Sequence, residues 1–243
     1  MIDRVKATLR PFGWYRAARF GWHYLRDPIF RRDHRLARRQ PENLFQFRTV
    51  TAPNRYPRLF AYLREHVTAP HARVLSFGCA TGEEVFSLRR YLPAATIKGL
   101  DINPANIATC ASRLAVAPDA GLAFAVGSSA ATETPESYDA VLALAVFQHP
   151  DLKLDRRVAT CAPRIRFVDF ERVVAGLAAG VKPGGYLALR HTAFRFADTA
   201  CSRDFTLRLE LPTEVAFFPR FDRDDRRIAD AATEQVVFQK NLR

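Results

Sequence analysis

The chain has 243 residues, and 48% of them are hydrophobic, so it is long enough to bury a sizeable core and is not a disordered chain. Its formal net charge at pH 7 is +12, and residues 1–40, with eleven basic residues against three Asp, carry +8 of that charge. The sequence has no run of about 18 apolar residues that would predict a membrane-spanning helix, and no apolar block near its start that would predict a secretory signal.

Residues 1–67 differ in composition from the rest and predict a basic, aromatic helical extension, followed by one domain over residues 68–243. Aromatic and aliphatic side chains between Tyr15 and Leu25 recur at roughly helical spacing. Several prolines break the stretch into short pieces, and residues 58–66 predict the helix that leads into the first strand.

The next segment, RVLSFGCATGEEVFSL, is the most informative of the chain. Val74 and Leu75 predict the end of a buried strand, Gly78 to Gly82 a tight glycine turn, and the residues from Gly82 onward a helix. A glycine turn lets the backbone approach a ligand closely, and the helix N-terminus behind it offers free N–H groups and a positive dipole end. The pattern predicts a site for the carboxylate or ribose of a nucleotide-like cofactor.

A second short strand is predicted over residues 96–100, with Asp101 at its carboxyl end. Asp101 follows Gly82 at the distance of one helix plus one strand, where an acidic group accepts hydrogen bonds from ribose hydroxyls. Asn103 and Pro104 predict the N-cap and first residue of the next helix. Capping that helix is therefore the alternative role of Asp101.

A nicotinamide or flavin site would carry G-x-G-x-x-G, but Ala80 and Glu83 stand at its second and third glycine positions. The observed G-x-x-x-G resembles motif I of class I S-adenosylmethionine-dependent methyltransferases, and GCATGEE resembles the chemotaxis-receptor methyltransferase type. The resemblance implies a methyltransferase with a doubly wound α/β fold, in which a mostly parallel, seven-stranded, Rossmann-like sheet follows the N-terminal extension.

The resemblance covers roughly residues 68–192 and places further elements along the chain. Those elements are the third strand at 123–127, the fourth at 137–144, an amphipathic helix at 167–179, the KPGG turn into the fifth strand at 182–187, and sixth and seventh strands at 205–211 and 234–240.

The implied cofactor is S-adenosylmethionine, with S-adenosylhomocysteine as its product. Cofactor contacts are expected from Phe77, Gly78, Cys79, Ala80, Thr81, Gly82, Glu83, Asp101, Ile102, Ser128, Ser129 and Ala145. By resemblance, Glu83 would bind the amino group of the cofactor, while Ser128 and Ser129 would meet the adenine edge. Thr81 and Glu84 have the spacing of a capping box, which needs no ligand.

His149 is the candidate catalytic residue, because an ordinary pKa near 6.5 suits a general base. A structural histidine at the start of a helix is the alternative. Gln148, Arg190, His191 and Arg195 are the candidate substrate-binding residues. Arg190 and His191 end the predicted fifth strand, where ligands bind in open α/β sheets, and an arginine there can hold a carboxylate or phosphate.

We expect methyl transfer to an O, N or C nucleophile of a small-molecule acceptor, without a metal. The alternatives are an RNA or protein methyltransferase that uses the basic N-terminal region, and a non-catalytic S-adenosylmethionine-binding module. Residues 1–40 are expected to cover the cofactor, as N-terminal helices do in similar proteins, or to meet nucleic acid or an anionic membrane surface. Four cysteines without C-x-x-C spacing predict reduced thiols and a cytoplasmic location. The oligomeric state stays open.

Overall fold

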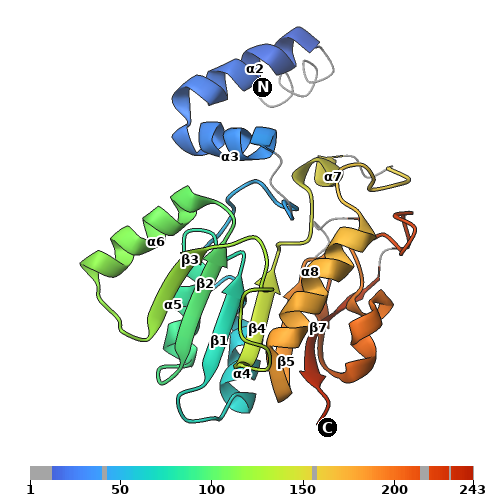
Figure 1. The fold of residues 1–243 in the computed structure, drawn as a ribbon. Helices are drawn as coiled ribbons and strands as arrows, with labels where there is room; N and C mark the ends of the chain where they lie inside the picture. The colour runs from blue at the N-terminus through green and yellow to red at the C-terminus, as the bar shows by residue number, and fades with distance from the viewer. Residues whose placement is uncertain (1–12, 40–42, 155–157, 214–218, 230, 243) are drawn as a thin grey trace. The chain divides into compact units, whose positions relative to one another are not determined.

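A seven-stranded sheet organises the larger part of the molecule (Figure 1). The strands are β1 (Arg73–Phe77), β2 (Thr96–Asp101), β3 (Leu122–Val126), β4 (Tyr138–Leu144), β5 (Val181–Arg190), β6 (Phe205–Pro212) and β7 (Thr233–Lys240). Their order is β3-β2-β1-β4-β5-β7-β6. The first five strands pair in parallel, and β7 runs antiparallel to both β5 and β6. The predicted doubly wound, mostly parallel sheet is confirmed, including its sixth and seventh strands.

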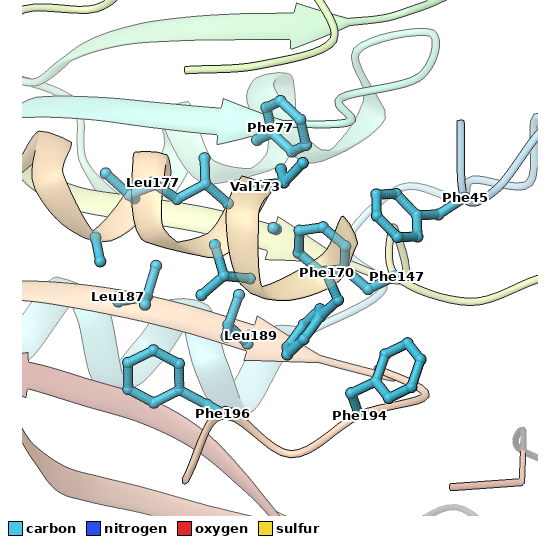
Figure 2. Packing of buried hydrophobic residues seen from close by; sticks show 14 of the residues in the cluster. Phe45, Phe77, Phe147, Phe170, Val173, Leu177, Leu187, Leu189, Phe194 and Phe196 are labelled. Atoms are coloured by element: carbon cyan, nitrogen blue, oxygen red, sulfur yellow. The ribbon is translucent and has the colours of Figure 1, made fainter. Parts of the chain in front are cut away.

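The helices pack on this sheet because its central strands are apolar on both faces. They are α4 (Pro57–His66), α5 (Glu83–Tyr91), α6 (Pro104–Val116), the short α7 (Pro150–Leu154) and α8 (Phe167–Gly180), with 3-10 turns at Phe196–Asp198 and Ala200–Asp204. One buried cluster contains the apolar face of α8, with Phe170 and Leu177. Figure 2 shows that cluster, in which Phe147 lies edge-on to Phe170 at the end of β4. The other cluster contains residues of α4 and α5.

The computed structural model describes residues 13–39, 43–154, 158–213, 219–229 and 231–242, so the predicted structure of the first twelve residues lies outside the described residues. The chain forms two compact units, Met1–Pro41 and Glu42–Arg243. The first unit contains α2 (Gly13–Arg26) and α3 (Pro28–Arg39). None of the described helices is long and apolar enough to cross a bilayer.

The second unit begins earlier than the predicted boundary at residue 67, which was based on composition. Phe45 is buried, and its ring lies edge-on to Phe147 with centroids 5.1 Å apart. α4 buries Leu59, Phe60 and Leu63 in the cluster beside the sheet. Residues 43–67 therefore belong structurally with the sheet.

Candidate functional site

The strand order reverses between β1 and β4, and their carboxyl ends meet at this reversal. In open α/β sheets, ligands bind in the crevice outside such a switch point. The glycine turn leaves β1 there, and Ala145 and Val146 leave β4. A Cβ on Gly78 would collide with Cγ2 of Val146, so the two segments pack directly against each other.

The glycine turn depends on backbone angles that favour glycine. Gly78 has φ +75° and Gly82 has φ +86°, with Ala80 between them at φ +50°. Gly82 is the left-handed N-cap of α5, so the helix begins one residue later than predicted. The predicted capping box is wrong, because this N-cap has no side-chain hydrogen bond and Glu84 Oε1 instead accepts a 2.8 Å hydrogen bond from Ser76 Oγ.

Asp101 fastens the glycine turn to the start of α6. Its side chain is buried, and Oδ2 accepts a 2.8 Å hydrogen bond from the Ala80 amide. Oδ1 accepts hydrogen bonds from the Asn103 amide at 2.8 Å and from Asn106 Nδ2 at 3.0 Å. The carboxylate therefore lies beside the glycine turn at the carboxyl end of β2 and also organises the start of the following helix, while its role toward a ribose stays a prediction.

Asn103 is the N-cap of α6, as predicted, and its Oδ1 accepts from the Ala105 amide at 3.1 Å. Its Nδ2 is buried and has no hydrogen-bond partner in the described part of the chain. An unsatisfied buried donor costs about 1–3 kcal/mol. A polar ligand beside Asp101 would supply the missing acceptor.

A cavity beside the turn is lined by residues that include Arg55, Tyr56, Gly78, Ala80 and Glu84. Burial raises the pKa of Glu84 to about 7, against the lowering effects of its Ser76 hydrogen bond and the Arg55 charge. The Glu84 carboxyl group at the cavity wall therefore titrates near neutral pH.

The neighbouring acid, Glu83, is held differently. Its Oε1 lies 2.7 Å from Nη1 of Arg113, and the same nitrogen donates to the Thr81 carbonyl at 2.8 Å. Arg113 therefore links α6 both to Glu83 at the start of α5 and to the carbonyl of Thr81 in the turn. Of the two adjacent acids, Glu84 lines the cavity described above, and the role of Glu83 toward the cofactor stays a prediction.

The pKa of Glu84 predicts a pH effect on stability. Because the folded pKa of about 7 lies above the ordinary 4.5, the folded state retains a proton that the unfolded state loses. The retained proton adds its full contribution to the free energy of unfolding below pH 4.5, and this contribution is lost as the pH rises through 7. Between pH 6 and pH 8, wild type should lose about 1 kcal/mol of unfolding free energy relative to Glu84→Gln. Urea unfolding at both values measures this, and equal losses in both proteins would contradict it.

Two predicted cofactor residues have buried side chains that pack beneath the glycine turn. The Phe77 ring is buried and stacks on Phe147, with centroids 6.3 Å apart (Figure 2), which leaves its backbone for a ligand. Cys79 is buried too, and its Sγ donates to the Ala80 carbonyl at 3.8 Å, while Cys110 Sγ donates to the same oxygen at 3.4 Å. Both thiol groups thus donate to the same carbonyl oxygen on the buried side of the turn.

The turn after β3 lies beside β2, because the Gly127 amide donates to the Asp101 carbonyl at 3.0 Å. Ser128 and Ser129 follow it and are half-buried. Ser129 Oγ accepts from the Ala131 amide at 3.0 Å, so this hydroxyl also shapes its own turn. The half-buried Ile102 follows Asp101 at the end of β2, so the fold brings the predicted adenine side and ribose side together.

Gln148 and His149 follow β4, which lies on the other side of the switch point from β2 and β3. Gln148 is buried, its Nε2 donates to the Ala145 carbonyl at 3.0 Å, and its Oε1 has no partner among the described residues. His149 packs edge-on against Phe47, with ring centroids 5.5 Å apart. The Gln148 Oε1 atom is thus available to accept a hydrogen bond, and the role of Gln148 toward an acceptor molecule stays a prediction.

Burial lowers the pKa of His149, with Arg164 and Arg48 lowering it further and Asp151 raising it. The lowered pKa favours the neutral form of the ring. The Asp151 amide donates to Nδ1 at 3.3 Å, which places the proton of the neutral ring on Nε2. His149 then presents a hydrogen-bond donor, and a role as general base requires the other tautomer.

Arg190 and His191 lie in a buried network at the end of β5. The Arg190 Nε donates to His191 Nε2 at 3.3 Å, so the Nδ1 proton of His191 is donated to the Tyr56 hydroxyl at 3.2 Å. Glu234 Oε1 accepts from the amides of His191 and Thr192, and burial raises the pKa of Glu234. Because Tyr56 also lines the cavity at Gly78, this network connects the two predicted sides.

Arg195 does not join the cavity at Gly78. Its guanidinium pairs with Asp198, with Nε 2.8 Å from Oδ2, and it lines another cavity with Glu210 and Arg220. Arg195 was predicted to bind substrate because it follows the fifth strand, but the chain has turned away there. Within the described ranges, no three His, Cys, Asp or Glu side chains are grouped to hold a metal ion.

Comparisons with known proteins agree with this geometry. Residues 75–187 match the family model described as a methyltransferase domain. Trans-aconitate 2-methyltransferase of Deinococcus radiodurans is 30% identical over 153 residues, which cover 63% of this chain and 50% of that protein. The matched region thus spans about half the length of this curated relative.

Two solved structures are similar to this chain, and the one with a TM-score of 0.50 shows the same fold. The YcgJ protein of Bacillus subtilis matches with a TM-score of 0.50 and 11% identity, over 77% of this chain and 100% of that one. Phosphoethanolamine N-methyltransferase 2 of Haemonchus contortus, in complex with S-adenosyl-L-methionine, matches with a TM-score of 0.42 and 18% identity, over 58% of this chain and 29% of that one.

Proposed function

We propose that this chain, whose residues 75–187 match the methyltransferase domain, is an S-adenosylmethionine-dependent methyltransferase. The observation that carries the proposal is the glycine turn at the β1–β4 switch point, with Asp101 bonded to the Ala80 amide inside it. The finer resemblance to the chemotaxis-receptor type depends on the GCATGEE run alone and stays a prediction.

The residues at this edge have the chemistry that the cofactor requires. Asp101 would accept from ribose hydroxyls, the unsatisfied Nδ2 of Asn103 would donate beside it, and the Glu84 carboxyl group, which lines the cavity, would meet the amino group. Gly78 and Gly82 leave the backbone open to close approach. The cofactor supplies a methyl group already activated on a sulfonium, so this chain mainly positions two reactants and excludes water.

For the acceptor we propose a small carboxylic acid. The relative named for trans-aconitate methylation supports this class, and Arg48 and Arg164, whose charges act on His149 together with that of Asp151, place two cationic side chains near that ring. A carboxylate is already ionised at pH 7 and needs no general base. His149 would then donate its Nε2 proton to the acceptor, whereas a hydroxyl or amine acceptor would require it as a base.

Replacing His149 by Ala tests this assignment. We expect kcat/KM to fall about 100-fold or more because the positioned group is lost, while S-adenosylhomocysteine affinity stays within about twofold, since the predicted cofactor edge is untouched. With a carboxylate acceptor, wild-type kcat should be flat from pH 6 to pH 9. The matched variant is His66→Ala, an exposed histidine on α4, which should retain wild-type rates. Unchanged kcat/KM in His149→Ala would remove His149 from the acceptor site.

The activity itself is tested by transfer of a labelled methyl group from S-adenosylmethionine. Wild type is incubated separately with small carboxylic acids, small amines and alcohols, RNA and unfolded protein. Label in the carboxylic acids supports the full proposal, and label in another pool contradicts the acceptor class only. Binding of the cofactor without transfer to any pool supports the non-catalytic module instead.

A further inference from the structure

A single residue, Asp27, connects α2 to α3, and hydrogen bonds around it stabilise the helical hairpin. Asp27 Oδ1 accepts from the amides of Ile29 at 2.9 Å and Phe30 at 3.0 Å, which caps α3. The Arg31 guanidinium donates to the carbonyls of Tyr24 and Leu25 at 3.2 Å each, which caps the end of α2. The sequence thus specifies a hairpin rather than one long helix.

A small aromatic cluster holds the two helices together. Phe20 contacts Phe30 and His34, with ring centroids 5.6 and 4.7 Å apart, and Phe30 contacts His34 at 4.5 Å. Tyr24 stacks on Phe20 at 5.7 Å. This cluster uses the inner face of α2, so other large side chains of that helix are left for its outer face.

The outer face of α2 exposes large apolar side chains. Trp14 is 65% exposed, Trp22 56% and Leu25 76%, and Ile29 at the start of α3 is 52% exposed. Trp22 and Leu25 follow Trp14 by eight and eleven residues, a spacing that places all three on one face of the helix. Apolar side chains gathered in this way mark an interaction surface rather than an ordinary solvated face.

The same hairpin is strongly basic. Residues 13–39 contain eight Arg and only two Asp. The Arg26 guanidinium lies 3.7 Å above the ring centroid of Trp22, so a positive charge stands directly at the apolar face. A surface of this kind complements a partner that is apolar within and anionic at its boundary.

We propose that the α2–α3 hairpin binds the surface of an anionic lipid bilayer. Trp14, Trp22 and Leu25 would enter the boundary between head groups and acyl chains, where indole rings are favoured. The arginines would stay at the level of the phosphates. Single-stranded RNA fits less well, because Arg26 already covers one face of the Trp22 indole and the aliphatic side chains of Leu25 and Ile29 offer no stacking surface.

Co-sedimentation of the full-length chain with lipid vesicles tests the proposal. One set of vesicles contains phosphatidylcholine alone, and the other contains phosphatidylcholine with about one third phosphatidylglycerol, which gives a negative surface potential. We expect binding to the anionic vesicles, little binding to the neutral ones, and weaker binding as salt rises.

Two variants separate the apolar and charged contributions. Trp22→Ala/Leu25→Ala should lower partitioning at least about tenfold, and Arg35→Gln/Arg38→Gln should lower it about fivefold per charge. The matched control is Val116→Ala/Val168→Ala, which removes exposed apolar side chains from the second unit and should bind as wild type does. Circular dichroism verifies that each variant is folded.

Three results would overturn the proposal. The first is a folded wild type that does not bind anionic vesicles but binds an RNA oligonucleotide in the same buffer. The second is self-association that depends on Trp22 and Leu25, without vesicle binding. The third is vesicle binding that both α2 and α3 variants retain in full.

Discussion

Asp101→Asn is expected to weaken binding of S-adenosylmethionine and S-adenosylhomocysteine about 10- to 100-fold, since a charge-assisted hydrogen bond contributes about 1.5–3 kcal/mol. The substitution removes the proposed ribose acceptor. It also places an amide NH2 against the donors that the carboxylate now satisfies, namely the amides of Ala80 and Asn103 and the side chain of Asn106. Calorimetric titration with S-adenosylhomocysteine measures the loss.

Asp119→Asn is the matched control for this variant. Asp119 pairs with Arg89, with Oδ2 2.7 Å from Nε, and precedes β3 at the opposite edge of the sheet from the glycine turn. We expect its affinity for S-adenosylhomocysteine to equal that of wild type. If Asp101→Asn also bound as tightly as wild type, Asp101 would serve only to hold the glycine turn and the start of α6 in place.

Gly78→Ala is expected to destabilise the fold by about 2–5 kcal/mol and to abolish cofactor binding. A left-handed backbone costs an alanine about 1–2 kcal/mol, and overpacking against Val146 Cγ2 adds about 1–3 kcal/mol. Urea unfolding measures the loss. Because the turn and the start of the segment after β4 would separate, the crevice at the switch point would change shape.

A second substitution separates these two causes. Gly78→Ala/Val146→Ala removes the colliding methyl group and should recover the overpacking part, leaving the backbone cost. Gly176→Ala is the control, because a Cβ there meets only the Ala131 amide at 3.9 Å, and alanine inside α8 should stabilise by about 0.5–1 kcal/mol. No recovery in the double variant would show that the collision with Val146 is not the cause.

The local order of strand, glycine turn and helix could be predicted from the sequence because each step has a short-range signal. Val74 and Leu75 indicate the buried strand, and the glycines mark the turn. Parallel strands bring their carboxyl ends to one edge of the sheet, so the sequence predicts that Asp101 and Ala145 lie near Gly78. The fold and the position of the candidate cofactor edge follow from these signals.

The contacts across the acceptor side could not be predicted in this way. Tyr56 and His191 are 135 positions apart in the sequence, and no periodicity indicates that they meet. The distinction between Glu83 and Glu84 depends on the start of α5 after a left-handed Gly82, which turns Glu84 toward Ser76. Composition grouped residues 43–67 with the basic extension, although Phe45 is buried against Phe147.

The most direct test of the cofactor site is calorimetric titration of the wild-type chain with S-adenosylhomocysteine, with a nicotinamide dinucleotide as the competing nucleotide. The glycine turn, Asp101 and Asn103 predict binding of S-adenosylhomocysteine in the micromolar range, about −8 kcal/mol, and no binding of the dinucleotide. A folded sample that bound the dinucleotide, or that bound neither ligand, would contradict the assignment of this switch point to S-adenosylmethionine.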